Sequence, residues 1–326
     1  MEGRESMELA EAGALRAKLD ADRQVADPEV DDLLVGAIDM HTHPSPSPFP
    51  RRISVLSAAQ DAASAGFRAI VCKSHHHNTQ MDVLATLGTG LLDDTPIDVF
   101  GGIALNHYVG GLNPYAVELC LGMGGRVVWF PTLFSSAHLG HEHSPDSAFR
   151  SSAVKLRQGE AVSILDDEGA IRPEAVDILE VIASQDAVMN AGHLPADEID
   201  VLIPAAVRAG VRRMVVSHPS FVIGATPART ASWTAQGVTI EQCISPALKF
   251  LTVAELRAYI TAVGADNTIL ASDYGQRKNP LPVTGFRRML RTLLDDGMPK
   301  EDLRKLVSDN PARILYRDQE PALSAG

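Results

Sequence analysis

Five side chains that can bind a divalent metal ion lie far apart in this sequence, each at the end of a short apolar segment. They are His41, His43, His193, His218 and Asp273. Imidazole and carboxylate groups suit a borderline cation such as Zn²⁺, and Mn²⁺, Fe²⁺, Co²⁺ and Ni²⁺ accept the same ligands. A single histidine at a strand end is more often a hydrogen-bonded structural residue, but five such residues in this order indicate a metal site.

The spacing of His41 and His43 indicates that both side chains lie on one face of a strand. In an extended strand, residues two apart point to the same face, so His41 and His43 would direct both imidazoles to one place. A bound divalent ion can lower the pKa of water to about 7. Asp273 could bind the ion, accept the proton of the attacking water and pass it to the leaving group. We therefore assign catalytic roles to Asp273 and His218.

Apolar segments of the strand type recur along the chain, and most are followed by a helical pattern. They span residues 35–43, 67–75, 97–105, 126–133, 187–194, 212–219, 238–244 and 267–275. Several are continuous apolar runs, as in parallel strands covered on both faces. Within each half of the chain they start about 30 residues apart, which matches one βα unit. The sequence predicts a distorted (β/α)8, TIM-like barrel of the α/β class, with the candidate ligands at the strand ends where barrel active sites form.

The remaining segments divide the chain around this barrel. We predict an N-terminal helical extension at 1–34, the barrel at 35–318 and a C-terminal tail at 319–326. The long gap between the fourth and fifth segments predicts a loop insertion after strand four. A small hairpin around Asp167–Gly169 follows this loop, and then a helix with Pro173 in its first turn.

The composition of the chain argues against two kinds of binding partner, nucleic acids and membranes. The 326 residues are 45% hydrophobic with a net charge of -12, which argues against nucleic-acid binding because phosphate contacts need a clustered basic surface. No apolar run approaches the roughly 20 residues that span a bilayer, and the first residues do not resemble a signal peptide. We expect a cytoplasmic enzyme that acts on a small-molecule substrate, without a membrane partner. The cysteines are scattered and odd in number, so we expect reduced thiols: Cys72, Cys120 and Cys243.

The order of the five metal-binding candidates resembles the amidohydrolase superfamily. The phrases ILASDYG (269–275) and NPARIL (310–315) are similar to those of its metal-dependent hydrolase branches that include the aminocarboxymuconate-semialdehyde decarboxylase-like proteins. The resemblance spans residues 37–315. It implies one or two ions per chain, attack by metal-activated water and proton transfer by the strand-eight Asp273, and it makes a homo-oligomer a further expectation.

The sequence departs from the binuclear pattern of that superfamily at strand four. Binuclear members carry a carboxylated lysine or a glutamate at its end, whereas this strand reads VVWFPTL. Lys73, at the end of strand two, has the parity that points inward, so Lys73 is a candidate bridging ligand if it is carboxylated. The alternative is a free lysine that binds a substrate carboxylate or pairs with Glu241.

Other histidines lie on the predicted loops around the strand ends. We predict that three side chains there bind substrate: His75, His107 and Tyr108. The loop after strand four contains an HxxHxH cluster that could bind an ion, although a solvated, mobile lid is the interpretation we favour: His138, His141 and His143. For Cys243 a small buried apolar role is favoured over a place in the site.

These features together predict a metal-dependent hydrolase that uses metal-activated water on an amide, lactam, lactone or related bond of a small molecule. Two alternatives stay open. One is a metal-dependent non-oxidative decarboxylase or other lyase that acts on a small carboxylated substrate. The other is a non-catalytic metal-binding scaffold, against which Asp273 counts, because a structural zinc site has closed coordination and needs no proton shuttle.

Overall fold

The computed structural model describes residues 27–142 and 154–316. Its strands pair in parallel throughout. They are β1 (Ile38–Thr42), β2 (Ala69–Cys72), β3 (Asp98–Phe100), β4 (Gly102–Ala104), β5 (Val127–Trp129), β6 (Val188–Asn190), β7 (Arg213–Ser217), β8 (Val238–Cys243) and β9 (Thr268–Ala271). Each predicted segment contains at least one of these strands.

The strands form two hydrogen-bonded sheets, β1-β2-β3 and β4-β5-β6-β7-β8-β9. β3 and β4 are consecutive in the chain and separated only by Gly101. At the other end, β9 meets β1 through a parallel bridge between Thr42 and Tyr274 and a hydrogen bond of 2.8 Å from the Asp273 amide to the His41 carbonyl. This parallel α/β arrangement fits the predicted TIM-like barrel.

The break at Gly101 has a steric cause. The start of α4 packs directly on the strand here, and a Cβ at Gly101 would lie 2.4 Å from the amide nitrogen of Gln80. Gln80 also accepts the Gly101 amide proton, and the Thr79 hydroxyl accepts that of Gly102. Because these side chains take backbone hydrogen bonds, the single predicted segment 97–105 becomes two short strands.

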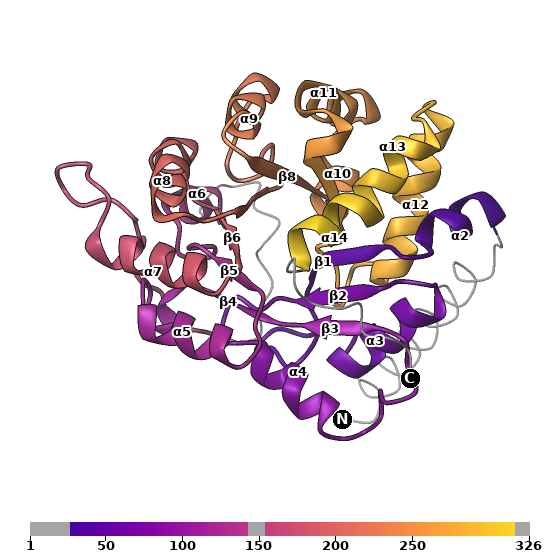
Figure 1. The fold of residues 1–326 in the computed structure, drawn as a ribbon, viewed down its shortest axis with the longest axis horizontal. Helices are drawn as coiled ribbons and strands as arrows, with labels where there is room; N and C mark the ends of the chain where they lie inside the picture. The colour runs from indigo at the N-terminus through magenta and orange to yellow at the C-terminus, as the bar shows by residue number, and fades with distance from the viewer. Residues whose placement is uncertain (1–26, 143–153, 317–326) are drawn as a thin grey trace, which may run out of the picture.

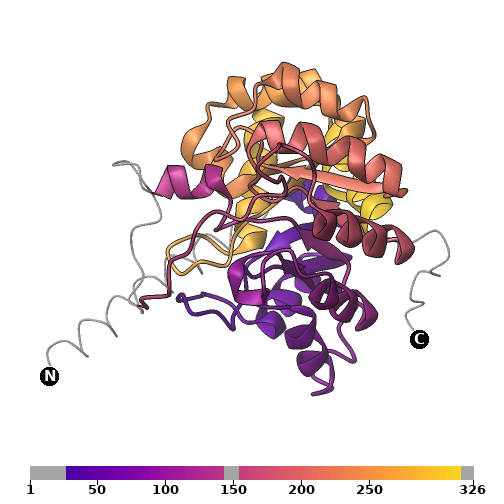
Figure 2. The ribbon, with the colours of Figure 1, turned by 90° about the vertical axis from the view of Figure 1, so that its left-hand side faces the viewer.

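The helices lie around the outside of the strands, as two views at right angles show (Figures 1 and 2). They are α2 (Pro28–Leu34), α3 (Val55–Ser64), α4 (Gln80–Leu87), α5 (Pro114–Gly122), α6 (Ser136–Glu142), α7 (Pro173–Ser184), α8 (Ala196–Ala209), α9 (Pro227–Thr234), α10 (Ile244–Phe250), α11 (Val253–Val263), α12 (Pro282–Asp295), α13 (Lys300–Arg304) and α14 (Asn310–Leu315). Short 3-10 turns lie at His107–Val109 and Ala265–Asn267, and a π-helical turn, Lys305–Asp309, joins α13 to α14.

Apolar side chains fill the layer between the strands and the helices. A second apolar cluster fills the space on the other side of the strands, where side chains from several strands meet. The interior cluster includes Ile38, Val127, Val215 and Ile269, and Ile314 of α14 joins it. Arg213, the first residue of β7, donates a hydrogen bond of 2.6 Å to the carbonyl of Arg313. The NPARIL helix therefore packs at the amino-terminal ends of the strands, which leaves the carboxyl ends for the site.

Several local predictions can be compared with the structure. An antiparallel bridge joins Leu165 to Ile171 around the expected hairpin, and α7 begins with Pro173 as predicted. Part of the expected N-terminal extension, residues 28–34, is helix α2, whereas residues 1–26, His143 and the expected tail 319–326 lie outside the described residues. Among the residues described, no helix is both long and apolar enough to cross a membrane.

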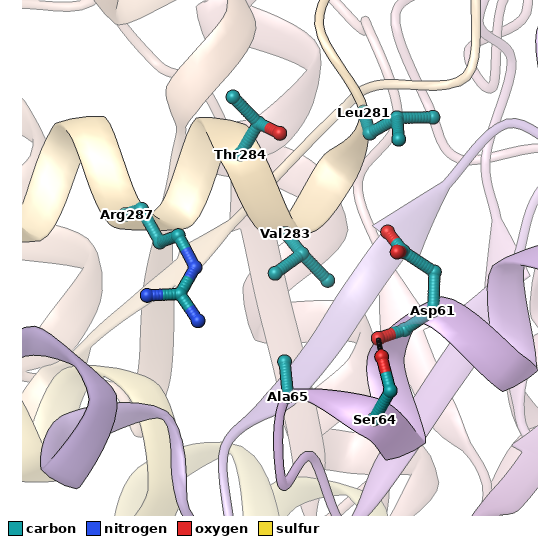
Figure 3. A pocket seen from close by; sticks show the side chains of 7 residues that line it. All are labelled: Asp61, Ser64, Ala65, Leu281, Val283, Thr284 and Arg287. Carbon is teal, nitrogen blue, oxygen red and sulfur yellow. Dashed lines mark hydrogen bonds between the residues drawn. The ribbon is translucent and has the colours of Figure 1, made fainter. Parts of the chain in front are cut away.

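A small surface hollow of about 210 Å³ lies between α3 and the start of α12 (Figure 3). Its lining residues are Asp61, Ser64, Ala65, Leu281, Val283, Thr284 and Arg287. Within it the Ser64 hydroxyl donates to the Asp61 carbonyl at 2.7 Å. The lining comes from outer helices and contains none of the predicted site residues, so this hollow is not the substrate site that the sequence indicates.

Candidate metal centre

Three of the predicted ligands converge at the carboxyl ends of β1 and β9. The Nε2 atoms of His41 and His43 lie 3.2 Å apart, and Asp273 Oδ1 lies 3.0 Å from His43 Nε2 and 3.5 Å from His41 Nε2. Both imidazoles are buried, whereas the Asp273 side chain is 19% exposed. The three ligand atoms therefore face one point that is accessible from the Asp273 side.

An irregularity in β1 aims the two imidazoles inward. Ile38 and Met40 belong to the interior cluster, but the pairing of β1 with β2 shifts register between Asp39 and Thr42. Such a bulge changes which face the following side chains occupy. His41 and His43 then point to the side of the strands on which Met40 also lies. Regular alternation would have placed them on the opposite side.

Hydrogen bonds on the far side of each ring fix the orientation of both histidines. His43 Nδ1 donates to the Lys73 carbonyl at 3.0 Å, and His41 Nδ1 donates to Glu241 Oε1 at 2.8 Å. Because a carbonyl and an ionised carboxylate can only accept, each Nδ1 is the donor, and Nε2 is the ring atom left for a cation. Burial raises the pKa of Glu241, but His41 outweighs this and holds it at about 2, so the carboxylate is ionised.

The protonation states fit a cation site. Burial lowers the pKa of His43 to about 3 and that of His218 to about 4, which makes both rings neutral near pH 7. Burial raises the pKa of Asp273, but the opposing effect of His41 and His43 is larger and keeps this carboxylate ionised. Neutral imidazoles and an ionised carboxylate are the forms that bind a divalent metal.

His218 joins this group from β7, together with a residue that we did not predict as a ligand. His218, Cys243 and Asp273 offer three ligand atoms within 4.8 Å of one another. His218 Nδ1 is buried, and no residue in the described ranges forms a hydrogen bond with it. A bound cation would satisfy this orphaned nitrogen.

Backbone strain occurs at the two strand ends that present His218 and Asp273. Their φ angles are 33° and 51°, in the left-handed region that side chains other than glycine rarely adopt. Such a conformation costs of order 1–3 kcal/mol and persists where the surrounding structure requires it, often at functional sites. The strain turns both side chains toward the candidate centre.

Sequence reasoning missed the roles of Glu241 and Cys243 on β8. Both are 1% exposed, and the Cys243 thiol donates to Glu241 Oε1 at 3.0 Å. A third group of potential ligands, within the same 4.8 Å limit, combines them with His41. Cys243 is buried, as the favoured interpretation expects, and it also lies beside the candidate ligands, which was the alternative left open. The available signal was the spacing of two between Glu241 and Cys243 at a strand end, the same pattern as His41-x-His43.

His193 contacts the ring of His218 but is not in the groups of converging ligand atoms. Its ring centroid is 4.9 Å from that of His218, and its Nδ1 lies 3.0 Å from Nδ1 of His138. His138 is 1% exposed and stacks on His193, so the expected solvated lid is wrong for this residue. The reason is α6, a short helix within the predicted loop, which turns His138 inward.

Lys73 and His75 extend the group along β2. The Lys73 side chain is buried, with Nζ 3.1 Å from His41 Nε2, and burial lowers its pKa. His75 Nδ1 lies 2.8 Å from the Thr132 hydroxyl, and its ring lies 4.9 Å from that of His43. Both side chains are therefore adjacent to the β1 imidazoles, as their predicted inward parity requires.

The other two predicted substrate-binding residues lie farther out. His107 is exposed, and its Nε2 donates to the Glu160 carbonyl at 2.8 Å. The Tyr108 hydroxyl donates to the Arg157 carbonyl at 3.3 Å, while its ring lies 5.2 Å from that of His76. The structure does not bring either side chain to the candidate ligands.

Comparison with known families gives a direct match over most of the chain. A family of unknown function, DUF6282, matches residues 36–241. The chain belongs to this family. The matched region of this DUF6282 chain includes all four candidate histidine ligands and ends at Glu241, whereas Cys243 and Asp273 lie beyond it. None of the curated proteins matches the chain.

Solved structures with a similar fold carry amidohydrolase-type titles. An amidohydrolase from Pseudomonas aeruginosa is 14% identical with a TM-score of 0.60, covering 88% of this chain and 97% of that one. The probable dipeptidase PvdM from Pseudomonas aeruginosa is 12% identical with a TM-score of 0.57, covering 88% and 96%. A mutant of the PTE-like lactonase from Deinococcus radiodurans is 14% identical with a TM-score of 0.54, covering 86% and 96%. The resemblance to the amidohydrolase superfamily is thus confirmed at the level of the fold.

Proposed function

We propose that this protein is a metal-dependent hydrolase of the amidohydrolase type that cleaves an amide, lactam, lactone or related bond of a small molecule. One observation carries the proposal. Two buried imidazoles, each fixed through Nδ1, direct their Nε2 atoms at each other and at an ionised, partly exposed Asp273. A closed structural zinc site would not need the accessible carboxylate.

The residues that would hold the ion fall into two groups that share Asp273. One group is His41, His43 and Asp273, and the other is His218, Cys243 and Asp273. His193, one ring away, stays a candidate ligand through its contact with His218. Zn²⁺ is the ion that we expect first, because it accepts nitrogen, oxygen and sulfur ligands.

When bound, the ion supplies Lewis-acid polarisation and lowers the pKa of water. The chain supplies the rest of the chemistry. Asp273, which contacts both histidines and is partly exposed, would accept a proton at its carboxylate and return it to the leaving group. Glu241 holds His41 in the tautomer that binds a cation, and His75 lines the wall where the substrate would lie.

A combined metal and substrate screen tests the function. Elemental analysis of the purified protein should find a bound divalent ion, and the loaded protein should hydrolyse members of a panel of lactones, cyclic amides and N-acyl amino acids. Product analysis separates the reactions, because hydrolysis adds the elements of water whereas a decarboxylase releases carbon dioxide. Absence of both bound metal and turnover with every added divalent ion would favour a scaffold instead.

A spectroscopic prediction tests the unexpected ligand, Cys243. In the Co²⁺-loaded protein we expect a thiolate-to-cobalt charge-transfer absorption that disappears in Cys243→Ser, because only sulfur ligation produces it. Cys120→Ser is the matched control, since Cys120 is an equally buried free thiol on the outer helix α5. If Co²⁺ binds without this absorption in the wild type, Cys243 is only a hydrogen-bond donor to Glu241 and the rest of the centre stands.

Metal stoichiometry tests the bridging role of Lys73. Its amine, 3.1 Å from His41 Nε2, would add carbon dioxide and lose one proton to become a carbamate ligand. With bicarbonate present, we expect the wild type to bind two ions per chain and Lys73→Met to bind one, as measured by elemental analysis. The exposed Lys278→Met provides the control. A single ion per chain in fully active wild type would remove the bridge.

A further inference from the structure

Arg51 and His76, near the candidate centre, have buried nitrogens without hydrogen-bond partners. Over residues 27–142 and 154–316, these are Nε of Arg51 and both ring nitrogens of His76. Buried polar atoms in folded proteins are almost always paired, so unpaired ones need an explanation. Neither residue belongs to the ligand groups described above.

The loops around the site hold Arg51 close to the centre. Arg51 forms an antiparallel bridge with Gln276, and the amide of Arg277 donates to the Pro50 carbonyl at 3.3 Å. Gly275 lets these loops approach, since a Cβ there would lie 2.0 Å from the His43 carbonyl oxygen. The loop after β1 is thereby fixed against the loop that follows Asp273.

The Arg51 guanidinium is near enough to His76 and Asp273 to interact with both through its charge. Its charge lowers the pKa of His76, after the larger effect of burial. Burial lowers the pKa of Arg51 itself to about 10, and Asp273 is the acid that opposes this shift. Because Asp273 would be engaged by a bound ion, the positive charge of Arg51 remains for another anion.

The surroundings of His76 are aromatic. Its ring centroid lies 5.1 Å from that of Phe49 and 5.2 Å from that of Tyr108. Both rings pack against that of His76, and the three would present an aromatic surface to a ligand bound at His76. A chain with a net charge of -12 repels anions in general, so a local guanidinium decides whether an acidic ligand can bind here.

We infer that Arg51 and His76 form a subsite that receives the carboxylate of a planar acid, with Phe49 and Tyr108 beside its flat part. The carboxylate would accept hydrogen bonds from Arg51 and from one ring nitrogen of His76, and the rest of the molecule would extend toward Asp273. The inference rests on the proposed function only in treating this acid as the uncleaved part of the substrate.

Calorimetric titration with benzoate and its neutral counterpart benzamide tests the subsite in both metal-free and Zn²⁺-loaded protein. We expect benzoate to bind more tightly than benzamide, and Arg51→Gln to weaken benzoate binding about tenfold or more, because a charge-assisted hydrogen bond is lost. Arg277→Gln, an exposed arginine on the neighbouring loop, should leave the affinity unchanged. Thermal melting of each variant verifies that it is folded.

Three results would overturn the subsite. These are equal binding of benzoate and benzamide, equal losses in Arg51→Gln and Arg277→Gln, or benzoate binding that requires Zn²⁺ and ignores Arg51. His76→Phe supplies a second variant that retains the aromatic packing but removes the ring nitrogens, and it should also weaken benzoate binding. Since the titration needs no turnover, failure of hydrolysis in the substrate screen leaves this test intact.

Discussion

Replacing Asp273 with Asn is expected to lower turnover by about a thousandfold, within the usual range for loss of a positioned acid–base group. The amide can neither accept the proton of the attacking water nor return it to the leaving group. Asn is the suitable replacement because it tolerates the left-handed φ of 51° at this position, which limits any change in the backbone. The measurement is kcat on whichever compound of the lactone, amide and N-acyl amino acid panel the wild type hydrolyses.

A control and a metal analysis complete this experiment. Asp266→Asn removes an acid whose side chain is 78% exposed and should leave kcat unchanged. We expect Asp273→Asn to retain part of its metal, because His41, His43 and His218 remain. Undiminished turnover with metal still bound would show that Asp273 does not transfer the proton.

The second large effect is the loss of metal-induced stabilisation in His43→Asn. An ion that binds only the folded protein stabilises it by about 2.7 kcal/mol at a hundred times its Kd. For a chain of 326 residues we expect the melting temperature of the wild type to rise by roughly 3–5 °C when Zn²⁺ is added to the metal-free protein. Removal of Nε2 of His43, which lies 3.0 Å from Asp273, should abolish most of this rise.

The comparison is made within each variant, with and without Zn²⁺, so any general destabilisation by the buried substitution cancels. His107→Asn is the control, because His107 is exposed and bonded to the Glu160 carbonyl, away from the ligand group. A chelator should reverse the shift in the wild type. If His43→Asn gains as much stability from Zn²⁺ as the wild type, the ion binds elsewhere.

Sequence periodicity was sufficient for the architecture. Parallel strands buried on both faces need continuous apolar segments, and the βα repeat needs their regular spacing, so both are legible in a local window. The positions of His41, His43, His218 and Asp273 at strand ends follow from the same pattern. The predicted hairpin and the proline at the start of α7 also depend on local rules, and the structure contains both.

Other features depend on elements that are distant in sequence. Glu241 matters because β8 faces His41 from about 200 positions away, and no window that contains one of them contains the other. The break at Gly101 arises where α4 packs on its strand. His138 is buried because α6 folds against His193, which a polar-looking loop does not indicate.

The sequence alone thus determined the fold class, the set of strand ends and four of the side chains that converge there. The tertiary structure decided the register shift in β1, the strained backbone at His218 and Asp273, and the places of Glu241, Cys243 and Arg51. Side-chain alternation is a property of one strand, whereas the distance between ligand atoms depends on how all the strands pack together. That distance is set by non-local pairing, which the order of residues encodes only through the folded chain.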